Sequence, residues 1–428
     1  MRQQYDSYKP TGIDWIGDIP SHWEVMPIKH LASYNDEVLS ENTNPNQVIR
    51  YVEIGDVNHT SGITTNKEYT FKEAPSRARR ITRHGDIIVS TVRTYLKAIA
   101  KVKECGLIVS TGFMVLRARK SIIANYLAYA IINDSFIQEI ISKSVGVSYP
   151  AINSSEVANI KILVPPLAEQ EAIATWLDEK CEEIDAAIAK VDREIELIDE
   201  LKQSEISRVV TRGLNPDAPL RPSGVDWIGD IPEHWKLVPL KHLVSYNDDV
   251  LSENIDKNHL INYVEIGDVC QSNGITNYKE YTFKEAPSRA RRITKKGDVI
   301  ISTVRTYLKA IAKVKQDDLI VSTGFMVLRA RSIDCNFLSF SLLNETFIQK
   351  IISKSTGVSY PAINSSDIAN IRILVPPMSE QQAIADNLDR KCAEIDGLKA
   401  KLTKKRETLT ELRQSIISEV VTGKRKVI

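Results

Sequence analysis

The stretch KEYTFKEAPSRARRIT occupies residues 67–82 and returns unchanged at residues 279–294. Around it, residues 9–182 come back as residues 221–393, with an offset of 212 that falls to 211 after Lys120. This period is far longer than that of solenoid repeats, whose units run to roughly 20–50 residues. The sequence therefore predicts a duplicated domain. Two alike domains suit a target that itself has two alike halves, and duplex DNA is such a target.

Length and composition place the chain among ordinary globular proteins. Its 428 residues suggest about two to three domains, and 43% hydrophobic with 26% charged residues is a typical composition. The five cysteines form no CxxC pair, which argues against a zinc ribbon and against a disulfide framework. The N-terminus has no apolar signal segment and no long apolar run follows, so we expect a cytoplasmic protein without a membrane partner.

The distribution of charge is more informative than the net charge of +1. Basic residues dominate between Lys72 and Lys103, and again between Lys284 and Lys315, whereas many acidic residues lie in the segments expected to be helical. Two basic patches that are balanced elsewhere in the chain suit a modular binder of a polyanion.

Each repeat divides into a globular part and a helical part. In the first copy, residues 86–92 and 112–118 are β-rich runs bounded by glycine, and residues 126–132 are expected to form a helix that continues towards residues 136–141. The fold class predicted is α+β, with two mixed α/β domains in tandem. We place the first domain at residues 1–164, the first long helix at 165–212, the second domain at 213–375 and the second long helix at 376–428.

The two helical parts carry apolar stripes. The first has 4-3 spacing typical of a coiled-coil seam, at Leu177, Cys181, Ile184, Ile188, Val191, Ile195 and Ile198. The second is less regular, because Lys399 and Arg406 replace two seam positions; its apolar residues are Leu388, Cys392, Ile395, Leu398, Leu402, Leu409, Leu412, Ile416 and Val420.

Neither helix, at about 40–45 residues or ~60–65 Å, is expected to be stable with its stripe exposed. The simplest solution pairs the two helices antiparallel, which would relate the domains by a pseudo-twofold axis and make the coiled coil a spacer between them. Packing of each helix on its own domain, or against another subunit, is the alternative.

Three short segments in each copy are candidates for contact with DNA: residues 76–80, 93–97 and 146–150, which return at 288–292, 305–309 and 357–361. Arginine forks suit phosphates and guanine edges, and a tyrosine among donors suits a groove-reading loop. Each segment has an alternative interpretation without DNA contact. Residues 76–80 would then be a solvated loop, residues 93–97 an edge strand with a core tyrosine, and residues 146–150 a turn with a purely structural role. The candidate residues are Lys72, Arg77, Arg79, Arg80, Arg93, Tyr95, Lys97, Ser148, Tyr149, Lys284, Arg289, Arg291, Arg292, Arg305, Tyr307, Lys309, Ser359 and Tyr360.

Catalytic signatures are missing from the sequence. It has no GxxxxGK[ST] loop for nucleotide phosphates and no Asn-Pro-Pro-aromatic tetrapeptide for adenine methylation. We therefore expect no catalytic residues, metal or cofactor in this chain. His22 with Trp23, and His234 with Trp235, are interpreted as structural, and Arg117 as a residue equally suited to a salt bridge of the fold.

The layout resembles the specificity subunit of type I restriction–modification systems. Each repeat opens with Gly-Ile/Val-Asp-Trp-Ile-Gly-Asp-Ile-Pro-x-His-Trp, at residues 12–23 and 224–235, and closes with Ile-Leu-Val-Pro-Pro-x-x-Glu-Gln-x-Ala-Ile-Ala, at residues 162–174 and 373–385. The resemblance covers the whole chain. It implies a non-catalytic subunit with two target recognition domains, each reading half of a bipartite DNA site, and helical regions that bind two methyltransferase subunits. It further implies that partner subunits hold S-adenosylmethionine for adenine methylation, and ATP and Mg²⁺ for a motor nuclease.

The near-identity of the two domains departs from the family's habit, in which the domains differ. We therefore expect an interrupted, nearly palindromic target, and we expect that half of the chain could dimerise and read the same site. The domains differ most at residues 42–50 against 254–262 and at 58–66 against 270–278, so base contacts there would make the half-sites unlike. The competing hypotheses are a coiled-coil adaptor that reads no bases, and a free-standing nuclease or methyltransferase.

Overall fold

The computed structural model describes residues 4–13 and 16–427, so Asp14 and Trp15 of the opening motif lie outside the described residues. The chain divides into two compact units. Unit 1 comprises Met1–Asp192 with Lys404–Ile428, and unit 2 comprises Arg193–Thr403. Among the described residues, no helix is long and apolar enough to span a membrane. The units do not test the predicted domain limits, because each unit joins a globular part to portions of both long helices.

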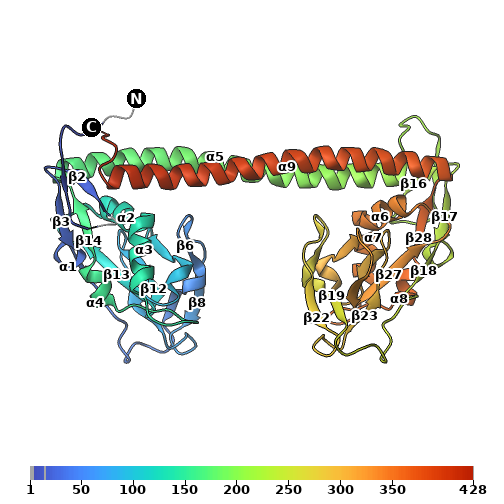
Figure 1. Ribbon diagram of the computed structural model, residues 1–428, viewed down its shortest axis with the longest axis horizontal. Coiled ribbons are helices and arrows are strands. Elements are labelled where there is room, and N and C mark those ends of the chain that lie inside the picture. The colour runs from blue at the N-terminus through green and yellow to red at the C-terminus, as the bar shows by residue number, and fades with distance from the viewer. Residues whose placement is uncertain (1–3, 14–15, 428) are drawn as a thin grey trace. The chain divides into compact units, whose positions relative to one another are not determined.

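Unit 1 begins with short strands and builds two four-stranded sheets (Figure 1). Its elements are β1 (Tyr8–Pro10), β2 (Asp18–Pro20), β3 (Glu24–Pro27), α1 (Ile28–Leu31), β4 (Ala32–Tyr34), β5 (Val48–Val52), β6 (Val57–Asn58), β7 (Gly62–Ile63), β8 (Lys67–Thr70), β9 (Ala78–Ile81), β10 (Ile87–Ser90), β11 (Ile99–Lys101), β12 (Leu107–Ser110), β13 (Phe113–Ala118), α2 (Ala124–Ile132), α3 (Asp134–Lys143), α4 (Ser154–Asn159) and β14 (Lys161–Val164).

Unit 2 repeats this order. Its elements are β15 (Leu220–Pro222), β16 (Asp230–Pro232), β17 (Lys236–Pro239), β18 (Val244–Tyr246), β19 (Leu260–Val264), β20 (Val269–Cys270), β21 (Gly274–Ile275), β22 (Lys279–Thr282), β23 (Ala290–Ile293), β24 (Val299–Ser302), β25 (Ile311–Lys313), β26 (Leu319–Ser322), β27 (Phe325–Ala330), α6 (Cys335–Leu343), α7 (Glu345–Lys354), α8 (Ser365–Ala369) and β28 (Arg372–Val375). The strands expected at residues 86–92 and 112–118 are thus confirmed. The helix expected from residue 126 towards residue 141 is two helices, α2 and α3, because Asn133 ends the first and caps the second.

The two sheets of unit 1 share a core. One sheet has the order β11-β10-β13-β4 and is antiparallel, and the other has the order β8-β5-β12-β9, in which β5 and β12 run parallel. Ile88 of β10 faces Val52 and Val109 of the second sheet, whereas Ile87 and Val89 join the core under α2 and α3. Successive side chains of a strand point to opposite faces. Burial on both faces therefore explains the unbroken apolar run of β10, and β24 does the same in unit 2.

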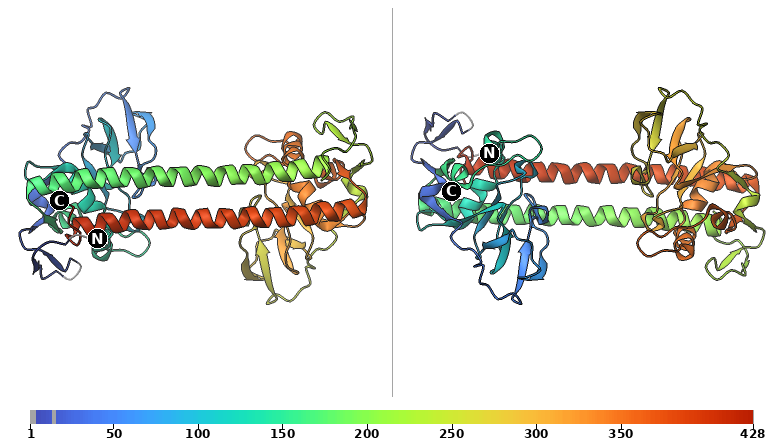
Figure 2. Two further views of the ribbon diagram at one scale, coloured as in Figure 1. Left: turned by 90° about the horizontal axis from the view of Figure 1, so that it is seen from above. Right: turned by 90° about the horizontal axis from the view of Figure 1, so that it is seen from below.

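The long helices are α5 (Leu167–Arg212) and α9 (Met378–Val421), each starting just after a Pro-Pro pair. They pair antiparallel in both units (Figure 2). In unit 1 Asp185 of α5 contacts Arg413 of α9, whereas further along α5, in unit 2, Lys202 contacts the earlier residue Asp396. Each helix also packs on globular cores, so pairing and packing on the domains occur together.

One part of the seam prediction was wrong, because Leu398 and Leu412 are exposed. Lys399 and Arg406 do occupy the seam of α9, as does Arg413, and each of the three meets a carboxylate of α5. The 4-3 step from Cys392 reaches these cations without a break. Their aliphatic stems can line a seam while their charged ends reach an acid, so the second stripe is regular once the cations are counted in it.

Candidate nucleic-acid interface

The arginine segment of unit 1 lies on β9, where Arg79 and Arg80 point to opposite faces of the strand. The Arg79 guanidinium lies 4.8 Å from the centroid of the Phe71 ring, a cation–π distance. The Nε of Arg80 is buried and has no hydrogen-bond partner among the described residues. Burial lowers the pKa of Arg80, yet a guanidinium stays charged at neutral pH. Arg79 is therefore held in place, whereas Arg80 carries an unsatisfied donor.

The loop after β10 holds two residues in the left-handed region. Arg93 has a φ of 50° and Lys97 a φ of 51°, conformations that cost roughly 1–3 kcal/mol each for residues other than glycine. The surrounding structure fixes them, because the Arg93 backbone N–H donates to the Pro150 carbonyl at 2.7 Å and the Thr94 hydroxyl donates to Ser144 at 2.8 Å. As a result Tyr95 is exposed, so it is not a core tyrosine.

The turn at residues 146–150 packs beside this loop. Gly146 has a φ of 118°, and a Cβ there would lie 3.1 Å from the Tyr149 carbonyl oxygen. The ring of Tyr149 is exposed and its centroid lies 4.9 Å from the Arg93 guanidinium. The loop and the turn therefore form one surface, on which a cation stacks on an aromatic ring.

A second link joins this surface to the arginine segment. The Thr111 N–H donates to the Arg77 carbonyl, and the Thr91 N–H donates to the Gly112 carbonyl, each at 2.8 Å. The turn after β12 thus ties the start of β9 to the loop that carries Arg93. We call Arg77, Arg79, Arg80, Arg93 and Tyr149 the basic edge of unit 1.

Unit 2 has the same arrangement, with its own basic edge. The Arg291 guanidinium lies 4.9 Å from the Phe283 centroid, and the Arg305 guanidinium lies 4.9 Å from the Tyr360 centroid. Arg305 and Lys309 each have a φ of 50°, and the Nε of Arg292 again has no partner among the described residues. The basic edge of unit 2 comprises Arg289, Arg291, Arg292, Arg305 and Tyr360.

Several predicted contact residues lie apart from these groups. The Lys97 ammonium is 3.1 Å from an Asp134 oxygen of α3, and Lys309 is 2.6 Å from Glu345 of α7, so both are directed toward helices. The remaining candidates are exposed: Tyr307 lies in a short 3-10 helix (Thr306–Leu308), and the others lie in loops, namely Lys72, Ser148, Lys284 and Ser359. The contact roles of all candidates stay predictions.

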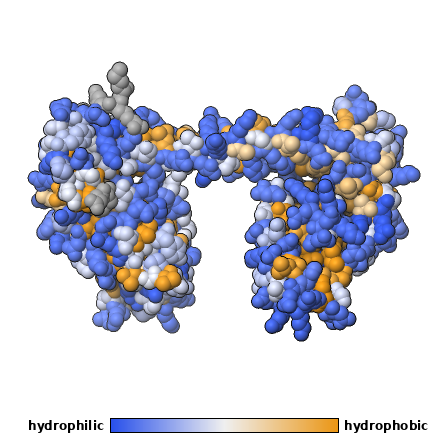
Figure 3. Space-filling view, in the orientation of Figure 1, coloured by the Kyte–Doolittle hydropathy of each residue, from blue (hydrophilic) through white to orange (hydrophobic). Residues whose placement is uncertain are grey.

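Sequence reasoning missed exposed apolar residues beside the basic edges. Val38 forms a β-bridge with Arg80 and is exposed, and Val147 at the tip of the turn is fully exposed. In unit 2, Figure 3 shows hydrophobic side chains gathered over β19 and β23, where Val250 bridges Arg292 and Leu260 opens β19. In the sequence, the only indication of these exposed apolar residues is that each stands in or beside a mostly polar stretch.

Other repeated motifs serve the fold. Arg117 of β13 contacts Asp86 at 2.8 Å and Glu37 at 2.6 Å, and these hydrogen bonds raise its pKa further. His22 lies 2.8 Å from the Glu169 carboxylate, as His234 does from Glu380. The glutamate of the closing motif therefore fastens the start of each long helix to the opening motif, which agrees with the structural interpretation of the histidines.

One of the two divergent segments contacts a helix. In unit 2 the Gln271 amide, between β20 and β21, donates to Gln203 of α5 at 3.2 Å and to the Leu343 carbonyl at 3.3 Å. The divergent residues at 270–278 thus include a contact with α5. The other divergent segment, 42–50, forms the loop before β5 and the first residues of that strand, and the Pro45 carbonyl accepts from the Lys72 N–H at 3.0 Å.

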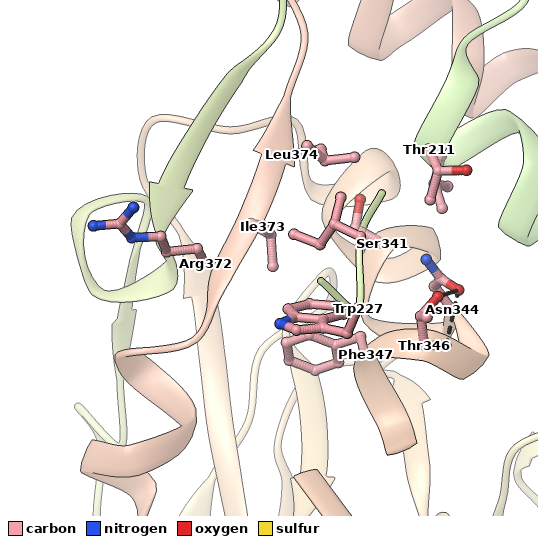
Figure 4. A pocket seen from close by; sticks show the side chains of 11 residues that line it. Thr211, Trp227, Ser341, Asn344, Thr346, Phe347, Arg372, Ile373 and Leu374 are labelled. Atoms are coloured by element: carbon pink, nitrogen blue, oxygen red, sulfur yellow. Dashed lines mark hydrogen bonds between the residues drawn. The ribbon is translucent and has the colours of Figure 1, made fainter. Parts of the chain in front are cut away.

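Trp227, the first tryptophan of the opening motif in unit 2, lines a small cavity. Trp227 lies over Phe347 of α7, with Ser341, Asn344 and Thr346 on one side (Figure 4). The cavity has a volume of about 30 Å³, which suits water rather than a nucleotide-sized ligand. The motif is therefore a packing element in unit 2.

Comparison with known proteins identifies the family. A sequence model described as "Type I restriction modification DNA specificity domain" matches residues 20–197 and 232–405. The specificity subunit of the type I restriction enzyme MjaVIII from Methanocaldococcus jannaschii is 26% identical, over 75% of each chain. The EcoKI specificity subunit of Escherichia coli K12 is 20% identical and covers 95% of this chain and 90% of its own.

A solved structure has the same fold. It comes from work on complex assembly and conformational transition of the type I R-M system, and covers 94% of this chain and 98% of its own, with a TM-score of 0.67 at 24% identity. The family match takes in most of both repeats. Both basic edges lie within the matched residues. The chain therefore belongs to the type I restriction modification DNA specificity domain family.

Proposed function

We propose that this chain is the non-catalytic subunit that gives a type I restriction–modification complex its sequence specificity, with each unit reading one half of a bipartite DNA site. The observation that carries the proposal is the repetition of the basic edge, down to the strained arginine stacked on an exposed tyrosine at 4.9 Å in each unit. Strained residues persist where surrounding structure over-determines them, and they cluster at functional sites.

The chemistry of the basic edge suits DNA. Guanidinium groups form two parallel hydrogen bonds with phosphates or with the O6 and N7 of guanine, and a bidentate base contact contributes about 1–3 kcal/mol of discrimination. Neither Arg80 nor Arg292 has an ion-pair partner among the described residues, and the Nε of each has no hydrogen-bond partner there, so the fold does not neutralise either guanidinium. Because the two edges consist of the same residues, we propose half-sites that are alike, hence a nearly palindromic target.

The remaining parts of the proposal rest on the likeness to specificity subunits. The long helices would dock two methyltransferase subunits at a fixed spacing, and other subunits would supply S-adenosylmethionine, ATP and Mg²⁺. In this arrangement the chain selects the sequence, and its partners carry out methylation and cleavage.

The test uses the complex of the full chain with its methyltransferase subunits, acting on a library of DNA duplexes with randomised sequence. Replacing the three arginines of one edge with glutamine (R77Q/R79Q/R80Q) should relax the methylated motif in one half only. The equivalent change in unit 2 (R289Q/R291Q/R292Q) should relax the other half. A charge-matched control in unit 1 is K29Q/K120Q/K161Q, which alters exposed lysines outside the segments of the basic edge.

The outcomes separate the hypotheses. Relaxation of one half by each arginine variant, with an unchanged motif in the control, supports reading by the basic edges. An unchanged motif in both arginine variants would contradict it and would favour the adaptor hypothesis. Methyl transfer or nicking by the isolated chain would show instead that it carries its own catalysis.

A further inference from the structure

Ion pairs join α5 to α9 within each unit, and three of the α5 residues that make them follow a seven-residue step. Successive acids of α5 on this step are Asp185, Asp192 and Asp199. In unit 1 the contacts are Asp185 with Arg413 at 2.8 Å and Asp192 with Arg406 at 2.5 Å. In unit 2 they are Asp199 with Lys399 at 2.7 Å, Lys202 with Asp396 at 2.7 Å, and Glu205 with Lys391.

Two of these contacts are copies of one another. At the offset of 211 that relates the repeats here, Asp185 corresponds to Asp396, and Lys202 corresponds to Arg413. The Asp185–Arg413 contact and the Asp396–Lys202 contact are therefore the same pair, present once in each unit. We call them the shared pairs. They would form equally well between α5 and a second α5, or between α9 and a second α9.

Two further contacts, both made by acids on the seven-residue step, have no copy. The repeat equivalents of Asp192 and Asp199 in α9 are threonines, at positions 403 and 410. The equivalents of Lys399 and Arg406 in α5 are isoleucines, at positions 188 and 195. We call Asp192–Arg406 and Asp199–Lys399 the unique pairs, because they form only where α5 meets α9.

We propose that α5 and α9 have diverged into complementary helices, so that α5 accepts α9 in preference to a second α5, and α9 accepts α5 in preference to a second α9. In the same register, two α5 helices would place Asp192 opposite Ile195 and Asp199 opposite Ile188. Two α9 helices would place Arg406 opposite Thr403 and Lys399 opposite Thr410. Each self-pair thus brings four like charges to the middle of the helix pair and gives none of them a partner.

The strength of this preference comes from the unpaired state. A single ion pair at a half-exposed position stabilises little, and the side chains here retain between 26% and 48% of their exposure. A charge that packs along a seam without its partner is more costly, because it is partly desolvated and uncompensated. Four such charges of one sign also repel one another across the helices.

The divergence has a consequence for the duplication. The basic edges of the two units are nearly identical, whereas the helices differ at the positions of the unique pairs. A half of the chain therefore carries a helix whose best partner lies in the other half. This runs opposite to the expectation that a half would pair well with itself, and it is independent of whether the units read DNA.

The test exchanges helix identity within the full chain. The first variant gives α9 the residues of α5 at four positions, K399I/T403D/R406I/T410D, and so imitates an α5 self-pair. The second gives α5 the residues of α9, I188K/D192T/I195R/D199T, and imitates an α9 self-pair. The chain with all eight changes restores both unique pairs with their polarity exchanged, since position 403 then meets 195 and position 410 meets 188.

We expect each variant with four substitutions to melt several degrees below the wild type. The variant with all eight substitutions should recover most of this loss in melting temperature. The differences should shrink at ~1 M salt, where the Debye length falls to about 3 Å. Melting of either four-residue variant at the wild-type temperature would overturn the proposal. The proposal would also be overturned if the variant with all eight substitutions lost as much melting temperature as the two variants with four substitutions lose together, because complementarity would then play no part.

Discussion

At the scale of single residues, Arg80 and Arg292 stand out because stability and binding set opposite demands on them. Each Nε is buried without a hydrogen-bond partner among the described residues, and an unsatisfied buried donor costs about 1–3 kcal/mol. The neighbouring Arg79 and Arg291 are stacked on phenylalanine rings instead. A position that costs stability in both copies is one that we expect to be used for binding.

Arg80→Met therefore should leave the melting temperature of the full chain unchanged or raise it, because methionine keeps an aliphatic stem and removes the unsatisfied donor. The same variant should lose about tenfold or more in affinity of the complex for its DNA site, the loss expected for one charged contact. Differential scanning calorimetry and a DNA-binding titration measure the two effects. A marked fall in melting temperature would show that Arg80 is a structural residue.

Position 146 offers a second test at the residue scale. Alanine there would place a Cβ 3.1 Å from the Tyr149 carbonyl oxygen at a φ of 118°, so the turn must deform. We expect Gly146→Ala to weaken DNA binding by displacing Tyr149 from Arg93, with little change in the unfolding of the core. Gly85→Ala, at another positive-φ glycine with no atom within 4 Å of its Cβ, is the control for backbone strain alone, and equal effects of the two changes on binding would contradict this role of the turn.

At the scale of secondary-structure elements, the helices were the most predictable feature and also the source of the clearest error. The 4-3 spacing predicted two helices of the right length, since α5 and α9 span 46 and 44 residues. Counting only apolar residues placed Leu398 and Leu412 on the seam. The cations beside them occupy it because their acid partners lie on the other helix, and a partner on a distant segment is invisible to periodicity.

Acid should weaken the helix pair in unit 2 through Glu205. Hydrogen bonds from Arg208, and then from Lys391 of α9, lower the pKa of Glu205 from 4.5 to about 2. A depressed pKa in the folded state adds stability above pH 4.5, and this stability is lost as the pH falls toward 2. Thermal melts between pH 5 and pH 3 should show a smaller acid-induced decrease for Glu205→Gln than for the wild type, and equal decreases would show that this carboxylate does not contribute.

At the scale of the whole molecule, the sequence predicted the duplication and the α+β class because near-identical segments must fold alike. It identified the arginines but not the surface they share. That surface depends on backbone hydrogen bonds such as Thr111 to Arg77 and Arg93 to Pro150, which join segments far apart in the chain. The exposure of Val147 likewise follows from the turn rather than from residue type.

The central claim is that two like units read two like half-sites, and mapping of methylated adenines across the genome tests it most directly. Cells that express the partner methyltransferase should be compared with and without this gene. The account predicts that one bipartite motif with inverted, matching halves loses its methylation when the gene is removed. A lost motif with unlike halves would contradict the near-palindromic reading, and an unchanged methylation map would contradict the specificity role itself.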